Sequence, residues 1–398
     1  MLNQYVEVHS MKRREFLGTV TTTAVGAAAF PYINSNSYPL FAGSTERYSS
    51  KAISIVEETL VIDMLGSFQD DIHKRNGKLL IETWLEQPAS FTEEDFRTIQ
   101  SSGIDVFAMG DLLPEYDKMI EYMARWNGFI ASNSTYIERI DTPQKLDTLS
   151  LKNKLGLLLT FQDSSHFRTE KDVQLFRSFG QVVSQLTYNG ANKLGSGSFV
   201  PVDNGLTQYG AAIIREMNRV GMGVDVSHCG DRTLLDAMEI SSKPVLITHA
   251  SCRALNPGYP RAKTDEAIKK MAQSGGVMGI AMLRFMIRDQ EPVTMDHFLD
   301  HIDYVSRLVG VEHVGIGSDM SLWTEDAYPL ETRKKTLTNA PKEYKCHSNE
   351  NFLISIEGLN HPQRTFDVVE GLLKRNYSKE AIQNIVGHNF KRVLKELI

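Results

Sequence analysis

Two histidines, His228 and His249, share a local pattern that can hold a metal ion. Each follows a short apolar run and a small hydroxyl residue, as Ser227-His228 and Thr248-His249. The apolar runs are typical of buried strands, and the segment between them has the spacing of a helix. Strand, helix and strand with short connections form a parallel unit, so both imidazoles are expected at the carboxyl ends of neighbouring strands. Two imidazoles that converge there can share one metal ion.

The same alternation of strand and helix recurs along the chain. Buried strands are predicted at 60–63, 104–108, 155–160, 182–187, 224–226, 245–247, 276–281 and 313–318. Helical patterns cover 51–59, 93–101, 116–132, 208–220, 231–240, 264–273, 295–308, 365–375 and 379–398, with Asp231 and Ser378 as N-caps. Eight apolar strands that alternate with helices predict an α/β fold, a (β/α)8 TIM barrel. An open doubly wound sheet is the alternative, but the Gly195-Ser196-Gly197 turn lacks the helix start that a phosphate-binding turn needs.

Polar side chains follow several of these predicted strands. Gln162, Tyr188 and Asp319 each come directly after a strand, and Arg261 follows in a loop rich in proline and glycine. The carboxyl ends of the strands form the face of a barrel where its chemistry takes place. This set suits a metal-activated water that attacks a carbonyl, with Asp319 moving protons and Arg261 holding a carboxylate.

Composition excludes some other classes of function. The 398 residues carry a formal net charge of -6 with acids and bases interspersed, so nucleic acid is not an expected partner. A hydrophobic content of 41% is ample for one large domain. The three cysteines do not form a disulfide framework, and we interpret Cys229 and Cys252 as packing residues, with a bridge between them as the alternative.

The first residues have the pattern of an export signal. Arg13-Arg14 and the mild apolar stretch that follows match a twin-arginine signal, predicted to cover 1–31. A linker is expected at 32–50, and a single barrel domain at 51–398. The twin-arginine translocation machinery is then a partner, and the mature protein is expected in the periplasm or secreted.

Several motifs resemble the membrane (renal) dipeptidases, which are zinc peptidases with an amidohydrolase-type barrel. The matching runs are Gly205-Leu206-Thr207, Glu216-Met217-Asn218-Arg219, Asp225-Val226-Ser227-His228, Thr248-His249-Ala250-Ser251, Gly315-Ile316-Gly317-Ser318-Asp319 and Gly387-His388-Asn389-Phe390. The likeness covers residue 52 to the end. It implies that His228 and His249 bind one metal ion, that Asp319 handles protons and that Arg261 binds the carboxylate of the substrate.

The chain departs from the family pattern at the other metal ligands. Leu65 and Ser67 stand where the family has a His-x-Asp pair, and Gln162 stands where it has a bridging glutamate, unless Asp163 is the counterpart. Tyr188 replaces a histidine that polarises the scissile carbonyl. Two zinc ions would carry four positive charges against one clear carboxylate, so we expect one zinc ion or none, with Gln162 as a further candidate ligand.

Two hypotheses follow from these residues. The first is a metallohydrolase with a mononuclear site that cleaves a small dipeptide-like amide, a peptide or lactam bond, with Asp319 and Tyr188 as catalytic groups and Arg261 and Asn189 binding the substrate. The second is a non-catalytic relative that binds a peptide-derived ligand or assists metabolite maturation in the periplasm. The sequence leaves open whether the chain forms a homodimer.

Overall fold

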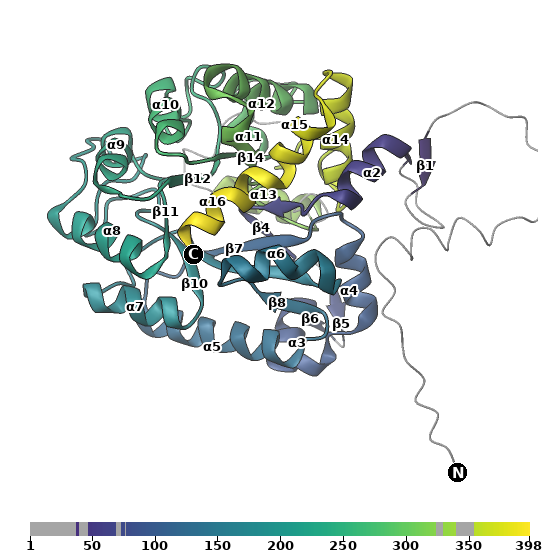
Figure 1. Ribbon diagram of the computed structural model, residues 1–398, viewed down its shortest axis with the longest axis horizontal. Coiled ribbons are helices and arrows are strands. Elements are labelled where there is room, and N and C mark those ends of the chain that lie inside the picture. Colours follow the sequence, from purple (N-terminus) through teal and green to yellow (C-terminus); the bar gives the residue numbers. More distant parts are fainter. Residues whose placement is uncertain (1–36, 40–46, 69–72, 76, 324–328, 340–353) are drawn as a thin grey trace, which may run out of the picture.

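Parallel strands follow one another around a barrel, with helices on the outside, in the computed structural model (Figure 1). The structure describes residues 37–39, 47–68, 73–75, 77–323, 329–339 and 354–398. The barrel strands run in chain order as β3 (Ile62–Asp63), β7 (Val106–Asp111), β9 (Leu155–Phe161), β10 (Gln181–Gln185), β11 (Gly223–Asp225), β12 (Val245–Ala250), β13 (Met278–Ile280) and β14 (Val314–Ile316). Each lies at or within a few residues of a predicted strand, so the predicted strand positions are confirmed.

The barrel closes between its last and first strands. The amide of Met64 donates to the carbonyl oxygen of Ile316 at 3.0 Å, and the short strands β4 (Gly66–Ser67) and β15 (Met320–Ser321) pair in parallel just beyond. An open sheet would leave these two edges unpaired. The predicted (β/α)8 barrel is therefore confirmed over the doubly wound alternative, and β8 (Ile137–Arg139) adds a side strand next to β9.

Helices link and cover the strands. They are α2 (Ser50–Glu58), α3 (Leu80–Glu86), η1 (Pro88–Ser90), α4 (Glu93–Gln100), α5 (Tyr116–Ser132), α6 (Pro143–Lys152), α7 (Glu170–Ser178), α8 (Gln208–Val220), α9 (Asp231–Ile240), α10 (Asp265–Gln273), α11 (Arg284–Ile287), α12 (Met295–Val309), η2 (Val311–His313), α13 (Leu330–Asn339), α14 (Arg364–Lys374), α15 (Lys379–Gln383), η5 (Asn384–His388) and α16 (Asn389–Leu397). The sequence patterns missed α3, α6, α7, α11 and α13.

Local sequence explains how the helices around the histidine strands begin and end. Thr207 caps α8 by accepting a hydrogen bond from the Gly210 amide, and Gly221 ends that helix with φ of 74°, a left-handed conformation that favours glycine. Thr264 caps α10 in the same way. These caps fix where α8 and α10 begin and where α8 ends.

The predicted N-cap of α9 is wrong. Gly230 is the cap residue and Asp231 is the first residue of the helix. The capping carboxylate comes from Asp203, in the loop between β10 and α8, which accepts hydrogen bonds from the amides of Arg232 at 2.7 Å and Thr233 at 3.2 Å. A cap from a distant loop leaves no local signal in the sequence, and this one fixes the start of α9 just after His228.

The carboxyl-terminal helices close the amino-terminal end of the barrel. Phe390 of α16 packs against Gly315 in β14, and Leu397 packs against Gly223 at the start of β11. The predicted single helix over 379–398 is instead α15, the π-helical turn η5 and α16. Gly387 in that turn lies so close to β3 that a Cβ atom there would be 2.0 Å from the Leu60 carbonyl oxygen, which requires glycine.

The chain before the barrel also contributes structure. Strands β1 (Ser37–Pro39) and β2 (Arg47–Ser49) pair within the predicted linker, and Figure 1 shows α2 beside α14. Tyr48 is 2% exposed and donates to a carboxylate oxygen of Asp367 at 2.8 Å, so packing begins before residue 51. The predicted export signal lies outside the described residues. None of the helices in the described ranges has the length and apolar character that a membrane span requires.

Helix α13 follows β15 along the chain, while 324–328 and 340–353 lie outside the described residues. Cys229 and Cys252 are buried free thiols, as the packing interpretation predicted.

Candidate active site

The two histidines meet at the mouth of the barrel, as their spacing predicted. His228 follows β11 and His249 lies in β12, and their Nε2 atoms are 3.0 Å apart. Both side chains are buried. The ring of Tyr188, from the end of β10, stacks on His228 with ring centres 4.2 Å apart. The sequence therefore places two imidazoles and a phenol in one small volume.

The hydrogen bonds around the pair assign a tautomer to each ring. The Thr248 hydroxyl donates to Asp225 at 2.7 Å, so its oxygen accepts from Nδ1 of His249 at 2.8 Å. On the other ring, Nδ1 of His228 donates to the side-chain amide oxygen of Asn189 at 2.6 Å. Both protons then sit on Nδ1, and the two Nε2 lone pairs face each other. In metal sites, a histidine ligand commonly binds the ion through one ring nitrogen and donates a hydrogen bond from the other, which fixes the ring. The two rings here have this arrangement.

The surroundings keep both imidazoles neutral. Burial, followed by the nearby charge of Arg261, lowers the pKa of His228 and of His249 well below the usual value, and Lys263 contributes in the same direction. A proton shared between the rings is therefore disfavoured at neutral pH, whereas a metal ion can bind both lone pairs. Two nitrogens on one tetrahedral zinc ion lie about 3.3 to 3.4 Å apart, so the pair fits one ion after a shift of a few tenths of an ångström.

Asp225 anchors the network beneath the histidines. Its carboxylate accepts hydrogen bonds from the amides and hydroxyls of Ser227 and Thr248, at 2.6 to 3.1 Å. Burial raises the pKa of Asp225, and these hydrogen bonds oppose the shift. The Asp225 carboxylate thus holds Ser227 and Thr248, the residues that directly precede the two histidines.

Arg261 is a buried cation without a described carboxylate partner. It is 1% exposed, its Nη1 atom lies 3.7 Å from the sulfur of Met286, and neither Nε nor Nη2 has a hydrogen-bond partner among the described residues. A buried guanidinium is costly unless it is paired. The two N–H groups of this guanidinium that lack a described partner have the chemistry to bind a carboxylate or a similar anion.

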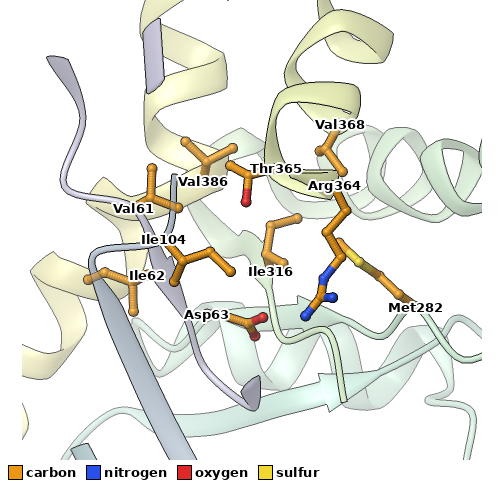
Figure 2. Close-up of a pocket in the computed structure, with 10 residues that line it drawn as sticks. All are labelled: Val61, Ile62, Asp63, Ile104, Met282, Ile316, Arg364, Thr365, Val368 and Val386. Atoms are coloured by element: carbon orange, nitrogen blue, oxygen red, sulfur yellow. The ribbon is translucent and has the colours of Figure 1, made fainter. Parts of the chain in front are cut away.

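Asp319 is held in an unusual backbone conformation beside these groups. Its φ is 59°, in the left-handed region. On one side, Asp63 accepts from the Ser318 amide at 2.8 Å and from its hydroxyl at 2.5 Å. On the other, Arg364 of α14 donates to the carbonyl oxygens of residues 320–322. Figure 2 shows the Asp63 and Arg364 side chains at one small cavity with otherwise mostly apolar walls.

The environment raises the pKa of Asp319 to about 6. Burial is the main cause, Arg261 lowers the pKa, and Asp63 raises it. Asp319 is therefore mostly ionised at pH 7 and can still accept a proton near neutral pH, as a general base or acid must.

Asp319→Asn is expected to stabilise the metal-free protein at pH 7.5 by up to about 3 kcal/mol, because the folded state no longer holds a disfavoured charge. A raised pKa means that the folded protein binds the proton more tightly, so the penalty is complete above pH 6 and disappears as pH falls to about 4. Urea unfolding of both proteins at pH 7.5 and pH 4 measures this. An equal stability difference at both pH values would contradict the assigned shift.

The first strand carries no ligand at the expected metal positions. The Leu65 side chain lies over Gly110, where a Cβ atom would be 1.8 Å from Leu65 Cδ1. The Gln162 amide donates to the Gly110 carbonyl oxygen at 2.7 Å, next to Leu65, and Ser67 pairs with Ser321 through β4 and β15. No group of three or more His, Cys, Asp or Glu side chains within the described ranges could hold a metal ion. Among the described residues, the histidine pair thus offers two ligands to one ion, and Leu65 offers none to a second ion.

The structure gives contacts for two further residues that the sequence analysis named. Asp163, the alternative bridging ligand, accepts from the amides of Ser165 at 2.6 Å and Tyr188 at 3.0 Å, so it shapes the loop that carries Tyr188. Asn189, predicted to bind substrate, accepts from His228 and orients that ring. Sequence reasoning also missed the supporting roles of Asp63, Asp225 and Lys263. The signal for Asp63 and Asp225 was a carboxylate at the end of an apolar strand.

Comparisons with known proteins agree with the fold. The model of the membrane dipeptidases (Peptidase family M19) matches residues 100–331. Dipeptidase tcpJ of Claviceps purpurea is 30% identical over 201 residues, 50% of this chain and 40% of that protein, and dipeptidase verJ of Clonostachys rogersoniana is 30% identical over 194 residues, 49% of this chain and 42% of that protein. The match spans about two fifths of the length of these relatives.

Solved structures extend the likeness of the fold over most of the chain. An amidohydrolase from Pseudomonas aeruginosa superposes with a TM-score of 0.71 at 24% identity, covering 87% of this chain and 98% of that one. A metallo peptidase from Rhodobacter sphaeroides, liganded with a phosphinate mimic of the dipeptide L-Ala-D-Ala, gives 0.66 at 15% identity and covers 86% of this chain and 100% of that one. At these identities the likeness concerns the fold alone.

Proposed function

Because this chain belongs to the membrane dipeptidase family, Peptidase family M19, we propose that it is a hydrolase of small dipeptide-like amides, either peptides or lactams, with one zinc ion on His228 and His249. The observation that carries the proposal is the facing pair of Nε2 atoms 3.0 Å apart, each with its proton assigned to Nδ1. With both rings protonated on Nδ1, the two Nε2 lone pairs repel each other, and a cation bound between them would remove that repulsion.

Each of the remaining groups has its own role in the proposed reaction. A bound zinc ion would supply Lewis-acid activation of water and of the scissile carbonyl. Arg261 binds the free carboxylate of the substrate, because its Nε and Nη2 atoms lack partners among the described residues. Asp319, with a pKa of about 6, takes a proton from the attacking water and donates it to the leaving amine. In this proposal Tyr188, which stacks on His228, donates a hydrogen bond to the carbonyl oxygen of the substrate.

A second candidate is binding without hydrolysis, and one observation favours it. The described part of the chain offers no third His, Cys, Asp or Glu ligand beside the pair, and catalytic zinc sites commonly have three protein ligands. The charges of Arg261 and Lys263, which lower the pKa of both imidazoles, also oppose a bound cation. In this case the pocket holds a peptide-derived carboxylate, or serves metabolite maturation.

Hydrolysis of a panel of dipeptides tests the proposal. Each dipeptide is supplied in two forms, one with a free carboxyl terminus and one with an amidated carboxyl terminus. We expect zinc-dependent release of free amino acids only from the free acids. Arg261→Met is expected to weaken binding of the free acids about 10- to 100-fold and to leave zinc binding intact. Calorimetric binding of a dipeptide without turnover, with or without zinc, would favour the second candidate. Equal affinity of wild type and Arg261→Met for free acids would contradict both.

We also propose export through the twin-arginine machinery to the periplasm or beyond, supported by Arg13-Arg14 and the apolar stretch that follows. The double variant Arg13→Lys and Arg14→Lys is expected to retain the precursor in the cytoplasm, because the translocase recognises the arginine pair. Fractionation of cells that express each form measures this. Equal amounts of both forms outside the cytoplasm would contradict it.

A further inference from the structure

Lys263 is a fully buried amine that the proposed reaction does not use. It is 0% exposed and lies in the loop between β12 and α10, next to the helix cap Thr264. Burying an amine is costly unless its N–H groups are hydrogen-bonded, so its partners indicate its role.

The side chain holds the turn that carries His228. Nζ of Lys263 donates to the carbonyl oxygens of Val226 at 3.3 Å and of Cys229 at 3.2 Å. These two carbonyls lie on either side of Ser227-His228. The amine therefore closes the turn from which the His228 ring projects.

The backbone of the same residue holds the segment after His249. The Lys263 amide donates to the Ser251 carbonyl oxygen at 2.8 Å, and the Lys263 carbonyl accepts from the Arg253 amide at 2.9 Å, with Cys252 paired in parallel to Lys263 between them. These partners follow His249 by two to four residues. One residue thus contacts both histidine-bearing segments, by its side chain and by its backbone.

We infer that Lys263 is a positioning residue that fastens the His228 turn to the His249 segment and so sets the alignment of the two imidazoles. Two hydrogen bonds need two N–H groups, which an ammonium and a neutral amine both provide. This positioning role of Lys263 applies to the metal-free protein. It therefore does not depend on the proposed hydrolysis.

Loss of the amine has a specific consequence. Without Nζ, the carbonyls of Val226 and Cys229 lose a buried donor, and the turn is free to find other partners. The His228 ring then no longer holds its 2.6 Å hydrogen bond to Asn189 in a fixed geometry. The ring is expected to exchange between its two tautomers.

Nitrogen NMR of the histidine rings in the metal-free protein tests this, with assignments from His228→Asn and His249→Asn. In wild type we expect Nδ1 protonated and Nε2 unprotonated on both rings. Lys263→Met keeps an unbranched side chain of similar size without donors, and we expect a mixture of tautomers on His228 and about 10-fold weaker zinc binding. The control is Lys269→Met, an exposed lysine on α10, which should change neither.

Lys263→Met with the wild-type tautomers and only a lower melting temperature would overturn the inference, as would a wild type that already exchanges tautomers. Should the variant not fold, acetylation of the native wild type decides instead. We expect Lys263 to stay unmodified while Lys269 reacts, and labelling of both at the same rate would overturn the inference. If wild type binds no zinc, the proposed function fails, but the tautomers still decide the role of Lys263.

Discussion

His228→Ala is expected to weaken zinc binding by more than about 100-fold and to abolish zinc-dependent hydrolysis. Loss of a supporting hydrogen bond to a metal ligand already costs about 10- to 100-fold in affinity, and this change removes one of two ligands. The vacated volume also removes the support under the Tyr188 ring, which lies 4.2 Å from the His228 ring. Zinc titration by calorimetry measures the effect.

His388→Ala is the matched control, because His388 is an exposed histidine in η5, in the helices that close the opposite end of the barrel. It should bind zinc as wild type does. His249→Ala should reproduce the His228→Ala result, since the two Nε2 atoms face one position. Unchanged zinc affinity in either active-site variant would require the single-ion mechanism to be abandoned.

The triple change Leu65→His, Ser67→Asp and Gln162→Glu is expected to add a second zinc ion and to raise dipeptidase activity by about two orders of magnitude or more. The resemblance to the membrane dipeptidases places metal ligands at these three positions. Two new carboxylates offset the two charges of a second ion, which the present site cannot do. Metal analysis and dipeptide turnover of the purified variant measure the result.

Leu65→His alone is the control for this gain. It adds an imidazole without a carboxylate, so the second ion should remain unbound. A triple variant with the parent's metal content and activity would show that more than these three ligands has been lost. Tyr188, in place of the family's histidine, would then be the next position to change.

The strands of the barrel were predictable because each is a short apolar run buried on both faces. The pairing of His228 with His249 was predictable for a related reason: both follow such a run at the same offset, and parallel neighbours end at one edge. Helix α5 and helix α8 begin and end at the predicted residues, since long amphipathic patterns define their own limits.

The hydrogen bonds that hold the site residues in place were not predictable, because they join residues far apart in the chain. Asp63 binds Ser318 across 255 positions, and Asp203 caps a helix 29 positions away. Nothing in the sequence distinguishes Lys263 from a surface lysine, but in the fold its amine lies between two backbone carbonyls. The tautomers of the histidines depend on Asn189 and Thr248, whose hydrogen bonds follow from the loop geometry.

The central claim is that the histidine pair holds one zinc ion and that the rest of the family's metal site has been lost. Elemental analysis of the protein after folding with excess zinc and removal of unbound metal tests it most directly. One zinc ion per chain in wild type, and none in His228→Ala, is the predicted result. Wild type without zinc, or with two ions per chain, would contradict the account.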